Sequence, residues 1–180
     1  MPIGQADAAL EPLGAAHIDR NHVVGTWRNV FICVWRHQTE ESAIVKLKPV
    51  IEGLKIRNPA GIAMLTVVEP DADLPTPGAR QALPRLFKEV AKGISCSALV
   101  FEGEGFRAAA VRALTTTFNM VASQPFPHRV CSNVAAAEAM FIGGLPASTH
   151  GEKLQRGELV RAVSAFRARL DAWQSEQGSR

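Results

Sequence analysis

Two glycines and two glutamates mark the turn where phosphate-binding chemistry would be sought. The segment LVFEGEGFRAAA carries Gly103 and Gly105 after an apolar run and before a helical pattern. A dinucleotide site needs the third glycine of G-x-G-x-x-G, and Ala108 stands in its place. Glu102 and Glu104 would also repel a phosphate. The sequence therefore favours a tight structural turn between strand and helix, in which the glycines permit a positive φ.

Catalytic and metal-binding residues show no familiar spacing. No histidine pair has the H-x-x-x-H spacing of a helical metal site, there is no G-x-S-x-G elbow, and the chain has no tyrosine. The histidines lie far apart along the chain at His17, His22, His37, His128 and His150. We therefore expect no enzymatic activity, no metal site and no cofactor.

The three cysteines form no C-x-x-C pair, and each lies inside an apolar run. Buried free thiols in a reducing compartment are the simplest interpretation of such residues, and a thiol inside a strand is usually inert. These cysteines are Cys33, Cys96 and Cys131.

Composition and charge exclude several classes of protein. Twenty basic and seventeen acidic side chains give a formal net charge of +3, and the basic residues are scattered rather than clustered. A nucleic-acid partner would need a basic stripe, and a membrane span would need about 20 consecutive apolar residues. The first residues do not have the pattern of a secretion signal. We expect a cytoplasmic protein that binds no nucleic acid and has no membrane span.

The apolar periodicity predicts an ordered succession of strands and helices after a loose tail at residues 1–20. Residues 22–27 and 29–36 read as a β-hairpin turning at Arg28 and Asn29. A helix begins near Thr39 as its N-cap and runs to Asn58, with Pro49 favouring a kink or an early break. The remaining expected elements are strands at 61–69, 97–102 and 128–132 and helices at 77–93, 106–123 and 134–142.

This order of elements predicts the fold class. A hairpin followed by alternating helices and strands indicates an α/β protein with a mixed sheet, in which parallel strands are joined by crossover helices. The helices should cover at least one face of that sheet. There are too few strands for an eight-unit barrel, and no repeat period is visible.

Three segments together resemble the STAS family and its SpoIIAA-like relatives, the bacterial anti-sigma-factor antagonists. They are NVFICVWRHQTEESAIVKLKPVIEGL, GIAMLTVVEP and ALVFEGEGFRAAAVRALTTTFNMVASQPFPHRVCSNVAAAEAMF. The similarity covers residues 21–144, and its marks are the first strand pair, the EGEGFRAA turn and the ending P-x-x-V-x-x-x-x-x-A. The resemblance implies a regulatory STAS-like domain at 21–144 that docks a partner protein or, as in some relatives, holds an apolar or anionic ligand. None of its marks is a catalytic signature.

The expected contact face lies where the carboxyl ends of neighbouring parallel strands meet, since open α/β sheets engage ligands there. It comprises the loop and helix start at 70–80 and the turn at 102–107. The residues predicted to bind the partner are Asp71, Asp73, Thr76, Arg80, Glu102, Glu104 and Arg107. The alternative function is that of a carrier or sensor of a small apolar or lipid-like ligand, with a pocket between the sheet and the helices that contain Phe87 and Phe118.

Thr76 has two interpretations. Relatives that switch by phosphorylation carry an Asp-Ser-Gly or similar stretch at this place, whereas this chain has EPDADLPTPGAR with Thr76 as the only hydroxyl. A phosphate there would gain from the helix N-terminus, although Asp71 and Asp73 would oppose it. The simpler interpretation is an N-cap threonine followed by Pro77 at the first helical position.

Residues 145–180 are expected to form a linker and an amphipathic helix. Large apolar side chains recur there in steps of four and three, at Leu159, Val163, Phe166, Leu170 and Trp173. This stripe needs a surface to cover it. Three surfaces are available, namely the chain's own domain, a second copy in a homodimer, or a different protein.

Overall fold

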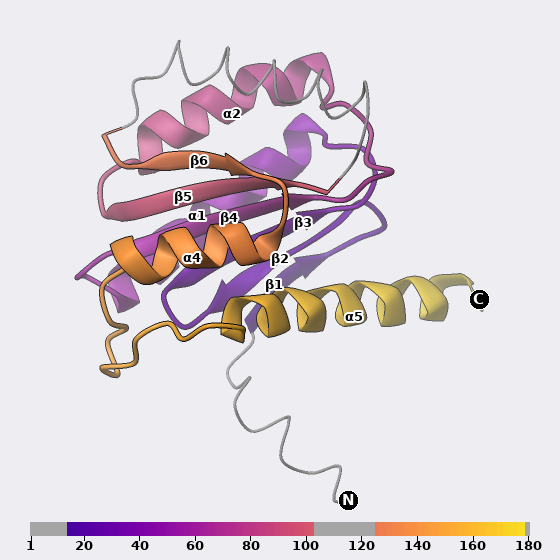
Figure 1. Cartoon of the computed structure of the whole chain (residues 1–180). Helices are drawn as coiled ribbons and strands as arrows, with labels where there is room; N and C mark the ends of the chain where they lie inside the picture. The colour runs from indigo at the N-terminus through magenta and orange to yellow at the C-terminus, as the bar shows by residue number, and fades with distance from the viewer. Residues whose placement is uncertain (1–13, 103–124, 179–180) are drawn as a thin grey trace, which may run out of the picture.

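A six-stranded mixed sheet forms the centre of the protein in the computed structural model, which describes residues 14–102 and 125–178 (Figure 1). The strands lie side by side in chain order. The first two pairs, β1 with β2 and β2 with β3, are antiparallel, and β3 to β6 run parallel. Their bounds are β1 Gly14–Ile18, β2 His22–Trp27, β3 Val30–Trp35, β4 Ile62–Val68, β5 Ile94–Phe101 and β6 His128–Cys131.

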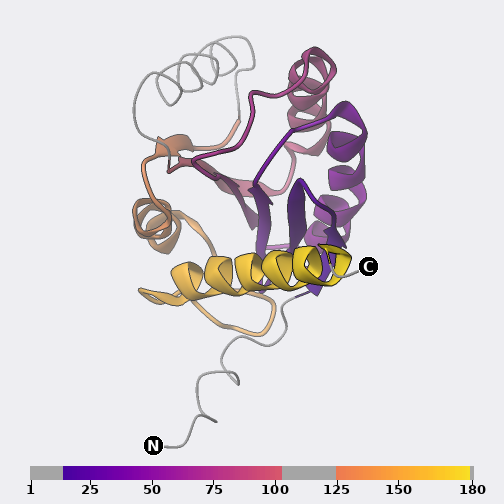
Figure 2. The same ribbon diagram turned by 90° about the vertical axis from the view of Figure 1, so that its right-hand side faces the viewer.

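Helices cover both faces of the sheet. Helices α1 (Glu41–Arg57) and α2 (Pro77–Val90) pack on one face, and α4 (Val134–Gly144) and α5 (Glu158–Gly178) pack on the other. Figure 2 shows the sheet between these two layers. All six residues of β3 are buried, as expected for a central strand with apolar side chains on both faces. The predicted fold class, a mixed sheet with an N-terminal hairpin and covering helices, is confirmed.

The C-terminal helix α5 packs on its own domain. Leu159, Val163, Phe166 and Leu170 are at most 1% exposed and belong to the same core as Val23, Trp27 and Val34 of the sheet. Trp173, the last residue of the predicted stripe, is partly buried. These four residues are therefore covered within the chain, and pairing of two copies through α5 stays a prediction.

Polar groups fix the beginning of α5 from two sides. Buried Glu138 of α4 accepts hydrogen bonds from the backbone N–H groups of Gly157 and Leu159, at 2.7 and 2.8 Å. Arg28, at the tip of the β2–β3 hairpin, donates to both carboxylate oxygens of Glu158, at 2.7 and 3.0 Å. Arg28 has a φ of 51°, the left-handed conformation that a two-residue hairpin turn can demand.

Two expectations at the beginning of the chain are wrong. Residues 14–18 are not part of a loose tail but form the edge strand β1, because their backbone pairs with β2 from Gly14 opposite Thr26 to Ile18 opposite Val23. Thr39 does not cap α1: Glu40 holds the cap position without a side-chain bond, and buried Thr39 instead accepts the N–H of Thr76 on its carbonyl at 3.0 Å.

Pro49 neither breaks nor ends α1. Its missing N–H leaves the carbonyl of Val45 without a helical partner, and both residues lie on the exposed side of the helix, where water can bond that carbonyl. Strand β5 begins three residues before the predicted strand, at Ile94, because its first residues pair with β4. The helix predicted at 106–123 lies outside the described residues.

Candidate functional site

The predicted contact residues that the structure describes lie at the carboxyl ends of the parallel strands. Asp71 and Asp73 are exposed on the loop after β4, and Arg80 is half-buried in the first turns of α2. Glu102 follows β5 directly. Glu104 and Arg107 of the predicted set lie outside the described residues. The structure thus brings together the two strand ends that the sequence predicted to form one face.

The loop at 70–76 is held at both of its sides. Ala72 donates its N–H to the carbonyl of Glu69 at 3.1 Å, and Thr76 is tied to the carbonyl of Thr39 as described above. The side-chain amide of Gln38 donates to the carbonyl of Leu74 at 2.7 Å. Leu74 nevertheless keeps 39% of its surface exposed. The loop therefore presents an apolar side chain from a fixed backbone.

Thr76 is the N-cap of α2. Its hydroxyl oxygen accepts the N–H of Ala79 at 3.2 Å, and Pro77 occupies the first helical position. A third carboxylate, besides Asp71 and Asp73, lies near this helix start: a Cβ on Gly78 would come within 2.7 Å of Oε2 of Glu41. This negative charge would also oppose a phosphate on Thr76. Phosphorylation of Thr76 stays a prediction, tested by intact mass spectrometry of protein from its native cells.

Ion pairs connect the strand ends to α5. Arg36 after β3 contacts Glu69 after β4, with Nε and Oε2 2.6 Å apart. Arg167 of α5 bridges Glu69 and Glu102, with Nε 3.0 Å from Glu69 Oε1 and Nη2 2.5 Å from Glu102 Oε2. A hydrogen bond to Glu69 raises the pKa of Arg36, against the effect of burial. Through Arg167, Glu102 already has an ion-pair partner within the chain.

Sequence reasoning missed this network. Glu102 and Arg167 are 65 residues apart, and no motif includes both of them. The arginines of α5 read as the solvent face of an amphipathic helix. That one of these arginines, Arg167, lies at the strand ends can be deduced only when the packing of α5 across β2 and β3 is known.

A second cluster of polar side chains lies at the turn between β1 and β2. His17, Asp19 and His22 each offer one metal-ligating atom, and these atoms all lie within 4.8 Å of one another. His22 is fully buried, and burial lowers its pKa to about 4, although Asp19 acts in the opposite direction. Burial raises the pKa of Asp19, but hydrogen bonds from the backbone of Asn21 and His22, together with interactions with the rings of His22 and His17, leave its pKa lowered. The sequence showed no helical metal-binding spacing among the histidines, whereas the turn between β1 and β2 brings His17 and His22 together with Asp19.

The three thiols are free and buried, as the sequence predicted. Burial raises the pKa of Cys96 to about 11, and it also raises the pKa of Cys33 and of Cys131. Each thiol is therefore protonated at neutral pH and is a poor nucleophile.

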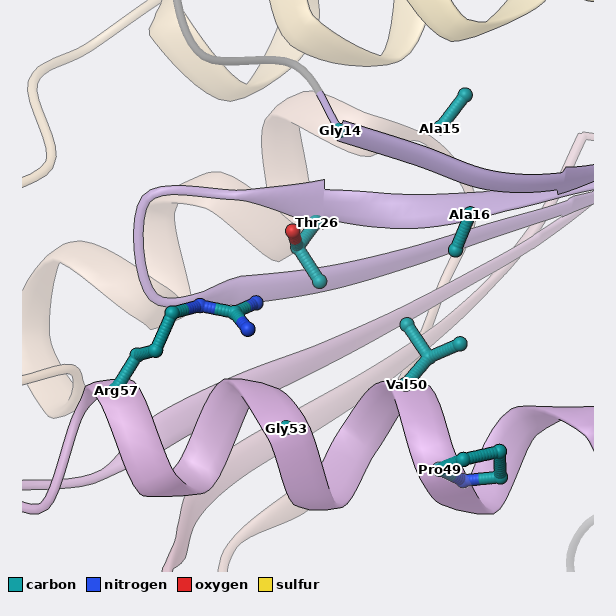
Figure 3. Close-up of a pocket in the computed structure, with 8 residues that line it drawn as sticks. All are labelled: Gly14, Ala15, Ala16, Thr26, Pro49, Val50, Gly53 and Arg57. Carbon is teal, nitrogen blue, oxygen red and sulfur yellow. The ribbon is translucent and has the colours of Figure 1, made fainter.

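The hollow shown in Figure 3 lies elsewhere than the expected ligand pocket. It has a volume of about 380 Å³ between β1, β2 and α1, where Val50 and Arg57 of α1 face Ala16 and Thr26 of the sheet. Phe87 does not line it. That side chain instead meets the ring of His128 edge-on at 6.4 Å, and Phe118 lies outside the described residues. The carrier function stays a prediction, and a copurifying lipid-like mass in native mass spectrometry would support it.

Comparison with known proteins gives one similar fold. No known protein family matches the sequence, and no curated protein matches it either. A solved structure is similar to this chain: an uncharacterized protein from the DUF3478 family with a SpoIIAA-like fold, from Shewanella loihica PV-4. It shares 14% sequence identity, with 71% of this chain and 93% of that chain covered, at a TM-score of 0.43.

Within residues 14–102 and 125–178, none of the helices has both the length and the apolar character needed to cross a bilayer.

Proposed function

We propose that the protein is a non-enzymatic regulatory module that docks a partner protein through its contact face, the loop and helix start at 70–80 and the adjoining turn at 102–107. The observation that carries this proposal is the loop at 70–76, which exposes Leu74 while hydrogen bonds from Gln38 and Thr76 hold its backbone. A loop that is already ordered loses little conformational entropy when it binds.

The chemistry of this face defines the partner's surface. An exposed apolar side chain surrounded by charges is the usual composition of a small interface, with an apolar centre and a polar rim. Asp71 and Asp73 on either side of Ala72 make this rim acidic. The partner therefore presents an apolar pocket flanked by lysine or arginine side chains. Such charge complementarity accelerates association and selects the partner.

We place the module in the cytoplasm. Its three thiols are free, and cysteines remain reduced in that compartment. The inert thiols agree with a docking role.

Site-specific photo-crosslinking in native cells tests the proposed interface. A photoreactive residue at position 74 should give a discrete cross-linked species, because Leu74 lies at the centre of the face. The matched control is position 56, since Ile56 is an exposed apolar residue of α1, 80% exposed, at the end of the helix away from the loop. Cross-links that form equally from both positions, or from neither, would contradict the proposal.

Charge reversal provides an independent readout. The double change Asp71→Lys and Asp73→Lys should remove the cross-linked species from position 74 while the protein stays folded, because both side chains are exposed. A cross-link that persists at full yield would mean that the acidic rim does not contact the partner.

A further inference from the structure

We propose that His17, Asp19 and His22 form a binding site for a divalent transition-metal ion of the Zn²⁺ class. The three residues come from the end of β1, the turn and the start of β2. The turn lies at the same end of the sheet as the contact face, because the carbonyl of Asn21 accepts the N–H of Arg36 after β3 at 2.8 Å.

The distances within the cluster suit one shared ion. Nδ1 of His22 lies 3.0 Å from Oδ1 of Asp19, and Nε2 of His17 lies 3.3 Å from Oδ2 of the same carboxylate. Ligands that each lie about 2.0–2.1 Å from a tetrahedral zinc ion are about 3.3 Å from one another. The carboxylate thus lies between the two imidazoles, with one of its oxygens near each ring, and the three ligand atoms lie within 4.8 Å of one another. Two nitrogens and one oxygen form a donor set typical of zinc and its neighbours.

The ring of His22 lacks a hydrogen-bonding partner. The side chain is fully buried, and neither of its ring nitrogens makes a hydrogen bond with any described residue. The 3.0 Å approach of Nδ1 to Asp19 does not have hydrogen-bond geometry, and Trp35 packs against the ring with centroids 4.6 Å apart. A buried polar group without a partner is costly. A metal ion would accept the lone pair of the ring nitrogen that faces the cluster.

The backbone of the turn positions the carboxylate. Oδ1 of Asp19 accepts the N–H groups of Asn21 and His22, at 2.8 and 3.1 Å. Such bonds to a ligand fix its direction and contribute to metal affinity. They leave Oδ2 directed toward His17.

Solvent reaches the cluster from one side. The side chains of His17 and Asp19 are 31% and 34% exposed, whereas His22 closes the inner side. An ion can therefore enter, and a fourth position stays open to water, as in zinc sites with three protein ligands.

Lys46 of α1 competes with the ion. Its Nζ lies 3.4 Å from Nε2 of His17, and its side chain is exposed. The ammonium must move away into solvent before a cation can bind. Replacement of this lysine by an uncharged residue should therefore tighten metal binding, which a merely adventitious histidine site elsewhere on the chain would not show.

Calorimetric titration of the full-length, metal-stripped protein with Zn²⁺ tests the proposal. The expected result is one ion per chain, with the affinity reduced at least tenfold in Asp19→Asn and in His17→Gln. The asparagine keeps an oxygen that can accept the backbone bonds of the turn, and His17 is partly exposed, so both variants should fold. The matched control is His150→Gln, which removes an exposed histidine elsewhere and should leave the affinity unchanged.

Lys46→Met should change the affinity for Zn²⁺ in the direction opposite to Asp19→Asn and His17→Gln. Its affinity for Zn²⁺ should rise severalfold, and the midpoint of thermal unfolding of the wild-type protein should increase with added Zn²⁺, because an ion that binds only the folded state stabilises it. Titrations with no stoichiometric binding would overturn the proposal. So would an affinity that is equal in wild type, Asp19→Asn and His17→Gln, since the ion would then bind elsewhere on the surface.

Discussion

Single polar side chains connect segments that are far apart in the chain. Buried Asn29 donates its side-chain amide to the carbonyl of Pro146 at 2.9 Å, and buried Ser97 of β5 is hydrogen-bonded through its hydroxyl to Nδ1 of His128 in β6. In each case a buried polar group has lost its contact with water and is hydrogen-bonded to a protein group instead. Loss of either group of such a pair leaves the other buried without a hydrogen-bonding partner. Substitution of one of these few residues should therefore lower the free energy of unfolding markedly.

The cap of α2 gives the first prediction at this scale. Thr76→Ala should lower the free energy of unfolding by about 1 kcal/mol, because the N–H of Ala79 loses its acceptor. Thr76→Ser keeps a hydroxyl and should restore most of that loss. Urea denaturation of the three proteins measures the difference. Equal stability of the alanine and serine variants would show that the hydroxyl does not act as a cap.

His128 gives a prediction of pH dependence. Burial lowers the pKa of His128 in the folded protein below its unfolded value, which is about 6.5. Between the folded and the unfolded pKa of His128, the unfolded chain therefore binds more protons than the folded protein. The contribution of neutral His128 to the free energy of unfolding is fully present above the unfolded pKa, and it is lost as the pH falls through the unfolded pKa toward the folded pKa. His128→Asn cannot titrate and should lose less stability than the wild type between about pH 7.5 and about pH 5.5.

Urea midpoints at the two pH values measure this effect. The pKa of buried His22 is also lowered, but that residue is present in both proteins, and effects of separate sites nearly add. The difference between wild type and variant therefore isolates His128. An identical loss of stability in the two proteins would contradict the argument.

At the scale of elements, apolar periodicity was sufficient to predict strands that are buried on both faces and helices that bury one regular face. It predicted the hairpin at 22–36 and the strand at 61–69 because these segments are almost continuously apolar and nearly all of their residues are buried. It failed for β1, whose residues GAAHI are small and half-exposed at the edge of the sheet and so show no pattern. The start of α1 was misread because Thr39 has a tertiary role that local capping rules do not include.

The close packing of α5 on β2 requires the absence of a side chain at Gly25. A Cβ on Gly25 would lie 2.2 Å from the carbonyl oxygen of Gly14 and 2.6 Å from the ring of Phe166. Gly25→Ala should therefore destabilise the fold by roughly 1–3 kcal/mol, since both β1 and α5 must shift. The matched control is Gly53→Ala in α1, where the nearest neighbouring atom is 3.5 Å away. There, helix propensity should raise the stability by about 0.5–1 kcal/mol.

Chemical denaturation followed by circular dichroism measures both changes. Limited proteolysis of Gly25→Ala should also cleave α5 faster than in the wild type. A Gly25→Ala protein as stable as the wild type would show that α5 does not pack on β2 as closely as described.

At the scale of the whole molecule, the candidate site joins segments from most of the chain. The sequence could predict that the loop after β4 and the turn after β5 meet, because parallel neighbouring strands end at one edge. It could not predict that Arg167 of α5 pairs with Glu102, or that His17, Asp19 and His22 converge, because these contacts depend on tertiary packing and on the register of the hairpin. The α5 helix therefore belongs to the core and also contacts Glu102 of the contact face through Arg167.

Removal of α5 tests this integration. Four fully buried side chains of α5 contribute about 1.5–3 kcal/mol each, or roughly 6–12 kcal/mol in total, and domains of this kind are stable by about 5–15 kcal/mol. A chain truncated to residues 1–148 should therefore lose its cooperative unfolding transition, bind a hydrophobic dye through the uncovered side chains of Val23, Trp27 and Val34, and scatter light as an aggregate. The control is the full chain with Trp173→Ala, which removes only a partly buried residue and should stay folded. A truncated protein that is folded, and that is a monomer where the full chain is a dimer, would show that α5 serves to pair two copies instead.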